Sequence, residues 1–152
     1  MTCVTLGAIK DLIQTNRTRS HERKSRVSLV EAPILIVNDN EFHLRTYKSI
    51  LEGKGHSAMA FETGAAAIEM AKGCKFSLAL LDVKLPDIRG DELARRLKEL
   101  DGGLNIILIT GYPSMQDCID ALELGIQEIL VKPIDSQGLL RATREALMGR
   151  RP

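Results

Sequence analysis

Short apolar runs alternate with longer segments of helical period from Pro33 onward. Runs such as ILIV, LALL and IILI are apolar at every position, whereas a strand with one exposed face would alternate apolar and polar residues. Such strands are buried on both faces, and their alternation with helices is typical of βαβ units. The pattern therefore predicts an α/β fold, with a parallel sheet covered by helices on both faces.

The same patterns give the bounds of the elements. Strands are predicted at 34–37, 57–61, 77–81, 105–109 and 128–131. Helices are predicted at 40–53, 64–72, 90–100, 114–124 and 136–148. Glycines at 53, 55, 73, 102, 103 and 125 fall where these helices end, which predicts left-handed caps. Ser114, with Asp117 three residues later, resembles a capping box at the fourth helix.

The first 32 residues differ from the rest of the chain. They hold six Lys/Arg against three Asp/Glu, and residues 15–28 contain few side chains that could be buried. We expect residues 1–32 to form a basic, flexible tail with a marginal helix at about 5–14, and residues 33–150 to form one domain. Nucleic acid is not an expected partner, because no aromatic residues interleave with the charges of the tail.

Composition narrows the class of protein. The chain has 152 residues and a net charge of +1, so it has no global attraction for nucleic acid or anionic lipid. Cys3, Cys74 and Cys118 show no paired or metal-type spacing, which fits a reducing cytoplasm. No apolar run approaches the roughly 18 residues that a membrane helix needs. We therefore expect a cytoplasmic protein that makes no contact with a membrane.

Polar side chains follow four of the predicted strands. Asn38 and Asp39 come after the first strand, Asp82 ends the third, Thr110 follows the fourth and Lys132 follows the fifth. The carboxyl ends of parallel strands form the edge at which open α/β sheets bind ligands. Two carboxylates, a hydroxyl and an ammonium at one edge form a coherent chemical set.

This set suits phosphoryl chemistry. Two carboxylates on adjacent strands would repel each other unless a cation lay between them, and hard oxygen ligands suit Mg²⁺. An aspartate can act as a nucleophile and become an aspartyl phosphate. The Lys132 ammonium can neutralise phosphoryl oxygens, and the Thr110 hydroxyl can donate a hydrogen bond to them.

The motifs at this edge resemble those of a known family. They are ILIVNDNE at 34–41, LALLDVKLPDIRGDEL at 78–93, IILITGYPS at 106–114 and ILVKPID at 129–135. In this order and spacing, the sequence resembles the receiver domain of two-component response regulators over residues 33–148. The resemblance implies a flavodoxin-like, doubly wound five-stranded parallel sheet of order 2-1-3-4-5.

The resemblance also implies a role for each site residue. Asp82 is the expected phospho-acceptor, with Thr110 as the switch hydroxyl and Lys132 as the contact to the phosphoryl group. Asp39 and Asp82 are expected to bind Mg²⁺ together with the backbone carbonyl of Lys84, and Asn38 could reach the ion through water. The Lys132–Pro133 peptide bond is expected to be cis.

A protein of this kind signals and is not an enzyme beyond its own phosphorylation and dephosphorylation. The resemblance implies that it takes its phosphoryl group from a sensor histidine kinase or a phosphotransfer protein. Phosphorylation would then alter the face formed by the fourth helix, fifth strand and fifth helix, through which the chain would contact a target protein or pair with a second copy. A fragment of a larger regulator, whose DNA-binding part is missing, would show the same sequence features.

Two positions depart from the family pattern. Asn38 stands where the family has its first acidic residue, and Ile129 stands where the family often has Tyr or Phe. These departures leave open an alternative, a pseudo-receiver that binds partners without phosphorylation. An aspartate-nucleophile phosphatase is disfavoured because Lys84 occupies the position of its second acid. A nucleotide-binding or flavin-binding protein is disfavoured because no Gly-rich loop follows the first strand.

Overall fold

A computed structural model describes residues 32–149. Strands occupy β1 Ile34–Val37, β2 Ala58–Phe61, β3 Leu78–Asp82, β4 Asn105–Thr110 and β5 Glu128–Val131. Helices occupy α3 Glu41–Gly53, α4 Gly64–Gly73, α5 Gly90–Leu100, α6 Met115–Leu124 and α7 Ser136–Leu147. All ten predicted elements are therefore confirmed to within about two residues at each end. The expected tail and its helix at 5–14 lie outside the described residues.

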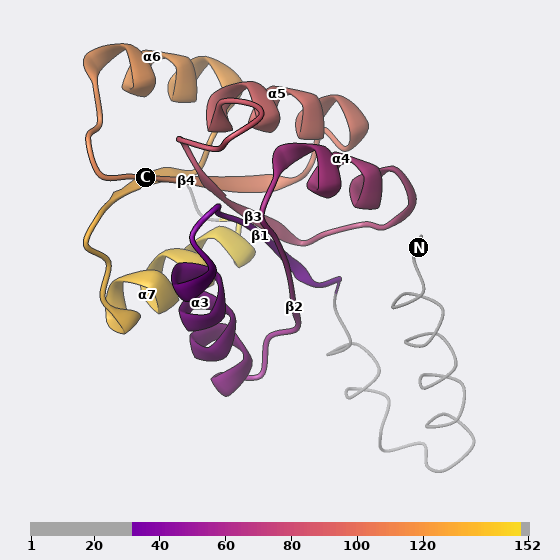
Figure 1. Ribbon diagram of the computed structural model, residues 1–152, viewed down its shortest axis with the longest axis vertical. Coiled ribbons are helices and arrows are strands. Elements are labelled where there is room, and N and C mark those ends of the chain that lie inside the picture. The colour runs from indigo at the N-terminus through magenta and orange to yellow at the C-terminus, as the bar shows by residue number, and fades with distance from the viewer. Residues whose placement is uncertain (1–31, 150–152) are drawn as a thin grey trace.

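The strands form one parallel five-stranded sheet of order β2-β1-β3-β4-β5, as expected. Helices α4, α5 and α6 cover one face of the sheet, and α3 and α7 cover the other (Figure 1). β1 and β3 are neighbours, with Val37 opposite Leu81. The polar residues that follow these two strands are therefore brought to the same edge.

Two hydrophobic cores lie on the two faces of the sheet, because successive strand residues point to opposite sides. Leu35, Val37 and Leu81 belong to the core beneath α4, α5 and α6. Ile36 and Leu80 belong to the core beneath α3 and α7. This alternation explains why the strand sequences are apolar at every position, and it fixes the direction in which the next residue of each strand points.

The helix ends follow the prediction only in part. The capping box of Ser114 and Asp117 is present, and Gly125 ends α6 with φ 72°. Gly55, just after α3, also has positive φ, at 90°. The prediction of left-handed caps at glycines 53, 73, 102 and 103 is wrong. Helices α4 and α5 instead end in extended residues, Cys74 and Asp101. No helix within residues 32–149 is long and apolar enough to cross a membrane.

Candidate functional site

The site lies at the carboxyl edge of the sheet, where the strand register aligns its residues. Asn38 and Asp82 each lie one position beyond the pair Val37 and Leu81, so both side chains belong on the face covered by α3 and α7. Asn38 is 1% exposed and Asp82 is 5% exposed. A carboxylate this deeply buried requires partners to compensate its charge.

Asp82 has such partners. The Lys132 ammonium lies 3.2 Å from Asp82 Oδ2, and the Lys84 backbone N–H donates to Asp82 Oδ1 at 3.3 Å. Lys132 is carried to this point by β5 and by the cis peptide bond to Pro133, as expected. The structure therefore brings the expected acceptor and the expected lysine into direct contact across 50 residues of sequence.

Thr110 completes the other flank of the site. It is the last residue of β4 and is 3% exposed, and its Oγ accepts a hydrogen bond from the Tyr112 backbone N–H at 3.1 Å. Its backbone carbonyl accepts from the Lys132 backbone N–H at 2.8 Å. The hydroxyl therefore closes the turn that leads from β4 toward α6.

Asp39 and Asn40 divide two tasks at the start of α3. Asn40 is the N-cap of the helix, and its side chain accepts from the His43 backbone N–H at 3.1 Å. Asp39 is exposed and makes no hydrogen bond or ion pair within the described part of the chain. Its carboxylate is therefore available to an incoming group.

Asn38 is oriented unexpectedly for a metal ligand. Its Oδ1 accepts the Asn40 backbone N–H at 2.8 Å, whereas its buried Nδ2 has no partner within the described residues. A metal ion needs an oxygen, and the Asn40 bond occupies one of the two lone pairs of Oδ1, so only one lone pair is left for a cation or a metal-bound water.

The remaining donors fit a hard divalent cation such as Mg²⁺. Asp39 supplies a free carboxylate, and Asp82 lies at the same edge with its oxygens directed at Lys132 and the Lys84 backbone. Within residues 32–149 no three His, Cys, Asp or Glu residues group together as a metal site. This agrees with the presence of an asparagine at position 38. The site therefore has fewer charged ligands than a three-carboxylate site.

The loop after β3 is held closely by backbone contacts and by two carboxylate bonds. The Gly90 N–H donates to the Val83 carbonyl at 2.8 Å, and a Cβ at Gly90 would collide with the Asp82 carbonyl oxygen. Asp87 accepts from the backbone N–H groups of Gly64 at 3.0 Å and Ala65 at 2.8 Å. These N–H groups, that of Gly64 first, hold the pKa of Asp87 below its usual value. The acceptor loop is thereby fixed to the start of α4.

Arg89 connects the same loop to α6. Its guanidinium binds Asp117 at 2.9 Å and Asp91 at 3.0 Å, and Asp117 is also half of the α6 capping box. A cavity of about 420 Å³ lies between this link and the site, lined in part by Lys84 and Thr110. Sequence reasoning did not identify Asp87 or Arg89 as site-supporting residues. A helix cap can be recognised in the sequence because its two residues are three positions apart. Asp87 and Arg89 bind residues 23 and 28 positions away, and no short motif predicts such bonds.

Tyr47 lies behind the site on α3 and is 5% exposed. Burial, and secondarily the Asp82 carboxylate, raises the pKa of this phenol. The phenol therefore stays protonated beside the acidic edge.

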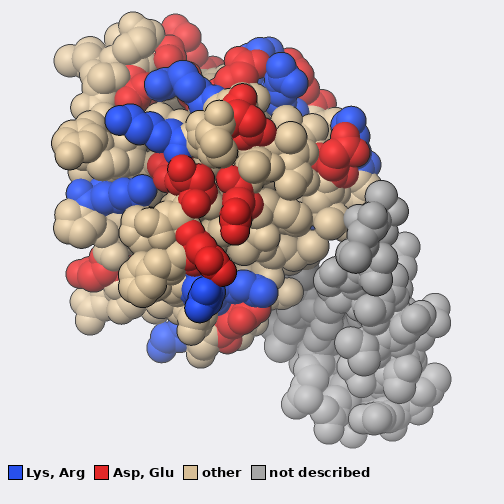
Figure 2. All heavy atoms as spheres, in the orientation of Figure 1, with Lys and Arg blue, Asp and Glu red and all other residues tan. Residues whose placement is uncertain are grey.

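Figure 2 shows acidic side chains gathered near the centre of one face of the molecule, with basic ones on either side.

Comparison with protein families identifies the motif set. Residues 34–144 match the family model described as the response regulator receiver domain. A transcriptional regulatory protein from Bacillus subtilis, YkoG, which is itself uncharacterised, is 36% identical over 114 residues, or 75% of this chain. The chain spans about half the length of that relative and about a quarter of several other curated regulators that it matches.

Solved structures agree in fold. The receiver domain protein from Methanospirillum hungatei is 33% identical, with a TM-score of 0.75, over 78% of this chain and 94% of that one. A response regulator from Burkholderia pseudomallei is 26% identical, with a TM-score of 0.69, over 79% of this chain and 76% of that one. The Burkholderia structure contains a phosphorylated aspartic acid and a calcium ion.

Proposed function

This chain belongs to the response regulator receiver domain family, and from that premise we propose that Asp82 is its phosphoryl acceptor. Receiver domains are signalling modules driven by phosphorylation, and they are not enzymes with a turnover of their own. The observation that supports this assignment is the contact of 3.2 Å between Asp82 Oδ2 and the Lys132 ammonium at the carboxyl edge of the sheet.

In the proposed transfer, an Asp82 oxygen attacks the phosphorus of a phosphohistidine on a sensor kinase or phosphotransfer protein. The new P–O bond forms as the P–N bond breaks, and the departing imidazole keeps the electron pair and takes up a proton. Lys132 neutralises a phosphoryl oxygen as the group arrives. Thr110 then exchanges its turn bond to Tyr112 for a bond in which its hydroxyl donates to the phosphoryl group.

Receiver domains typically depend on Mg²⁺, and we assign the ion here to Asp39, Asp82 and the backbone carbonyl of Lys84. When bound, such an ion neutralises the charge that develops on the transferred phosphoryl oxygens. Asn38 adds no charge to this set, and its Oδ1 is already bonded to the Asn40 N–H. We therefore expect weaker cation binding than an aspartate at this position would give.

The output face in this proposal is formed by α6, β5 and α7. Movement of Thr110 would be passed to α6, because only the short 111–114 turn separates them. Met115 and Leu122 on α6 and Val131 on β5 are exposed by 77%, 80% and 49%. Exposed apolar groups of this size favour protein contacts, which suits a downstream target or the expected pairing of two copies.

A cytoplasmic location is part of the proposal, since the exposed thiol of Cys118 suits a reducing compartment.

The second candidate function is a pseudo-receiver that binds partners without phosphorylation. The observation that favours it is the asparagine at position 38 with its oxygen turned away, together with the aliphatic Ile129. With isoleucine at position 129, no aromatic ring is present there that could turn inward when Thr110 moves. The two candidates differ in one measurable respect, namely whether Asp82 is esterified.

The test is intact mass spectrometry after incubation with acetyl phosphate and Mg²⁺. We expect an increase of about 80 Da, the mass of one phosphoryl group. Asp82→Asn should abolish this increase, and omission of Mg²⁺ should slow it. Asp101→Asn is the matched control, because Asp101 precedes β4 at the opposite edge of the sheet and its carboxylate binds only the Gly103 N–H within the described residues.

An unchanged wild-type mass under conditions that label a known receiver would favour the pseudo-receiver. Label that persists in Asp82→Asn but disappears in another variant would show that the acceptor is a different residue. Either result would leave the family membership intact and overturn the assignment of this site.

A further inference from the structure

Helix α6 carries an apolar stripe that nothing in the described chain covers. Met115, Ile119 and Leu122 are spaced four and then three residues apart, so they lie on one face of the helix. They are 77%, 41% and 80% exposed, and Ala121 is the buried residue of the helix. A contiguous exposed patch of this kind marks a surface that binds another protein.

The charged residues of α6 itself are all acidic. Helix α6 contains Asp117, Asp120 and Glu123 and no Lys or Arg. Asp117 is held by Arg89, but Asp120 and Glu123 form no ion pair within the described residues. We define the acidic stripe as Met115, Ile119 and Leu122 together with Asp120 and Glu123.

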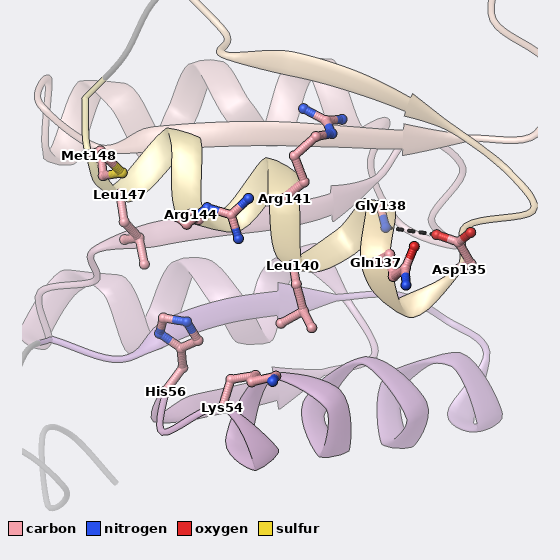
Figure 3. Close-up of a pocket in the computed structure, with 10 residues that line it drawn as sticks. All are labelled: Lys54, His56, Asp135, Gln137, Gly138, Leu140, Arg141, Arg144, Leu147 and Met148. Carbon is pink, nitrogen blue, oxygen red and sulfur yellow. Dashed lines mark hydrogen bonds between the residues drawn. The ribbon is translucent and has the colours of Figure 1, made fainter.

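A second unexplained feature is a groove on the other side of the sheet. It has a volume of about 1070 Å³ and lies between α7 and the turn that follows α3 (Figure 3). One wall is the outer face of α7, and the other wall is Lys54 and His56 of the turn. The residues of α7 and its C-cap that matter here are Leu140, Arg144, Leu147 and Met148.

The groove side of α7 adjoins the side that faces the core. Leu139, Ala142 and Ala146 are buried against the sheet. Leu140 and Leu147 pack at the margin of this core and also line the groove, and they are only half-buried. Helix α7 therefore has apolar side chains that the described chain does not cover completely.

The groove also presents cations without carboxylate partners. Arg141 is held by Glu128 at 2.8 Å and by Glu145 at 2.9 Å. Lys54 and Arg144, in contrast, make no ion pair within residues 32–149. Asp135 also lines the groove, and its carboxylate accepts from the Gly138 N–H at 2.7 Å at the start of α7. We define the basic groove as Lys54, Arg144, Leu140, Leu147 and Met148.

We propose that the acidic stripe of one molecule docks into the basic groove of a second copy. Each surface combines exposed apolar side chains with unpaired charge, and the two charges are opposite in sign. An amphipathic helix laid in a groove is a recurrent mode of recognition. Docking would place Asp120 and Glu123 near Lys54 and Arg144, while Ile119 and Leu122 covered the apolar floor.

The proposed contact has a defined symmetry. Because the stripe and the groove are different surfaces, the contact is head-to-tail, and a docked pair still has one free stripe on one molecule and one free groove on the other. The assembly therefore grows with concentration and does not stop at a dimer. It would also cover the α6 surface assigned above to a target protein, so the two contacts compete.

The test is sedimentation equilibrium of the full chain, without a phosphodonor, from about 10 μM to about 1 mM, a range suited to small, weak interfaces. The average mass of the wild type should rise with concentration, and high salt should reduce this rise. The groove variant Lys54→Glu/Arg144→Glu and the stripe variant Met115→Gln/Leu122→Gln should each remain monomeric. All four positions are exposed, so both variants should unfold as the wild type does.

Mixing the two variants gives the sharpest result. The groove variant keeps an intact stripe and the stripe variant keeps an intact groove, so an equimolar mixture should form a 1:1 dimer and grow no further. Lys72→Glu/Lys75→Glu is the matched control, because it makes the same charge change at the end of α4 and should assemble as the wild type does.

Three outcomes would overturn the proposal. A wild type that is monomeric throughout the range would exclude self-docking and leave an acidic helix of another protein as the occupant of the groove. A groove variant that still associates would indicate a symmetric contact between two stripes. A mixture that fails to form the dimer would show that the two surfaces do not meet. None of these results depends on the phosphorylation of Asp82, so the proposed function is tested separately.

Discussion

Asn38 shows how one amide changes the character of the acidic edge. Its Oδ1 serves the backbone of Asn40, and its Nδ2 is buried with no acceptor. An unsatisfied buried donor costs on the order of 1–3 kcal/mol. Because Asn38 is neutral, it does not repel the Asp82 carboxylate as a second buried carboxylate would. The unphosphorylated protein therefore depends less on a bound cation for its stability.

We predict that Asn38→Asp makes stability depend on Mg²⁺. Without metal, a carboxylate that is 1% exposed next to Asp82 should lower the free energy of unfolding by about 1–2 kcal/mol. With Mg²⁺, the added charge should tighten binding on the order of tenfold and restore the loss. Thermal unfolding across a Mg²⁺ titration measures both effects.

Asn40→Asp serves as the control for Asn38→Asp. It adds the same charge two residues away, but at an exposed N-cap where aspartate is equally suitable. We expect it to change stability little with or without Mg²⁺. Equal responses in the two variants would mean that charge near this edge matters and that the buried position of Asn38 does not.

Residues whose signal lies in a local motif were predicted from sequence. Asp82 and Thr110 each end a strand and Lys132 directly follows one, so strand prediction alone places them at one edge of the sheet. The structure places Lys132 3.2 Å from Asp82, and the role of each residue in phosphorylation stays a prediction. The direction of the Asn38 amide was not predicted, because it depends on which backbone N–H competes for its oxygen. That competition is decided by the turn geometry at Asn40.

At the scale of elements, two side chains of the loop after β3 connect it to the first turns of two distant helices. Asp87 binds the first two N–H groups of α4, and Arg89 binds Asp117 at the first turn of α6. Carboxylates are stabilised at helix N-termini by unpaired N–H groups and by the helix dipole. The acceptor loop therefore cannot shift without disturbing the start of a helix.

We predict that Asp87→Asn lowers stability by about 1 kcal/mol at pH 7, because the amide has one oxygen where the carboxylate uses two, one for the Gly64 N–H and one for the Ala65 N–H. The effect should depend on pH, because the N–H groups of α4 hold the pKa of Asp87 below its usual value of 3.8. A depressed pKa contributes stability that is fully present above pH 3.8 and is lost as pH falls through the lower, folded-state pKa. The gap between variant and wild type should therefore shrink as pH falls below about 4. Urea unfolding at a series of pH values measures it.

Asp101→Asn is the comparison for Asp87→Asn, because the Asp101 carboxylate also accepts from a backbone N–H, but only from that of Gly103, two residues away. We expect a smaller loss there. A gap for Asp87→Asn that stayed constant down to pH 3 would show that the carboxylate charge contributes nothing and that only the geometry of the cap matters.

Helix ends were harder to predict than helices. The helices and strands were predicted from the regular spacing of apolar residues. That spacing is needed along a whole element, because each element must direct its apolar side chains into the core. An end is decided by which group satisfies the last N–H or C=O groups, and glycine is only one solution. α6 uses Gly125, whereas α5 ends in the extended Asp101, whose side chain takes the Gly103 N–H. The composition at the two ends is similar, so the sequence could not separate them.

At the scale of the whole molecule, the domain consists of one sheet with a hydrophobic core on each face. Every buried hydrophobic side chain of the described chain lies between Ile34 and Ala146. The family match covers nearly the same span, residues 34–144. The sheet order was expected from the family resemblance, since apolar patterns alone do not say which strands are neighbours. The start of the domain at residue 33 remains a prediction.

That boundary can be tested by removing residues 1–31. Because the described residues from Ile34 onward form two cores with hydrophobic side chains on both faces of the sheet, we expect residues 32–152 to unfold within about 0.5 kcal/mol of the full chain, with the same denaturant dependence. Removal also takes away six Lys/Arg and three Asp/Glu, so unfolding in urea should be compared at low and high salt. A lower midpoint with a smaller denaturant dependence at both salt concentrations would mean that the first residues bury surface on the domain. The predicted boundary would then be wrong. An unchanged midpoint, together with an unchanged response to acetyl phosphate, would place both folding and phosphorylation within the receiver domain itself.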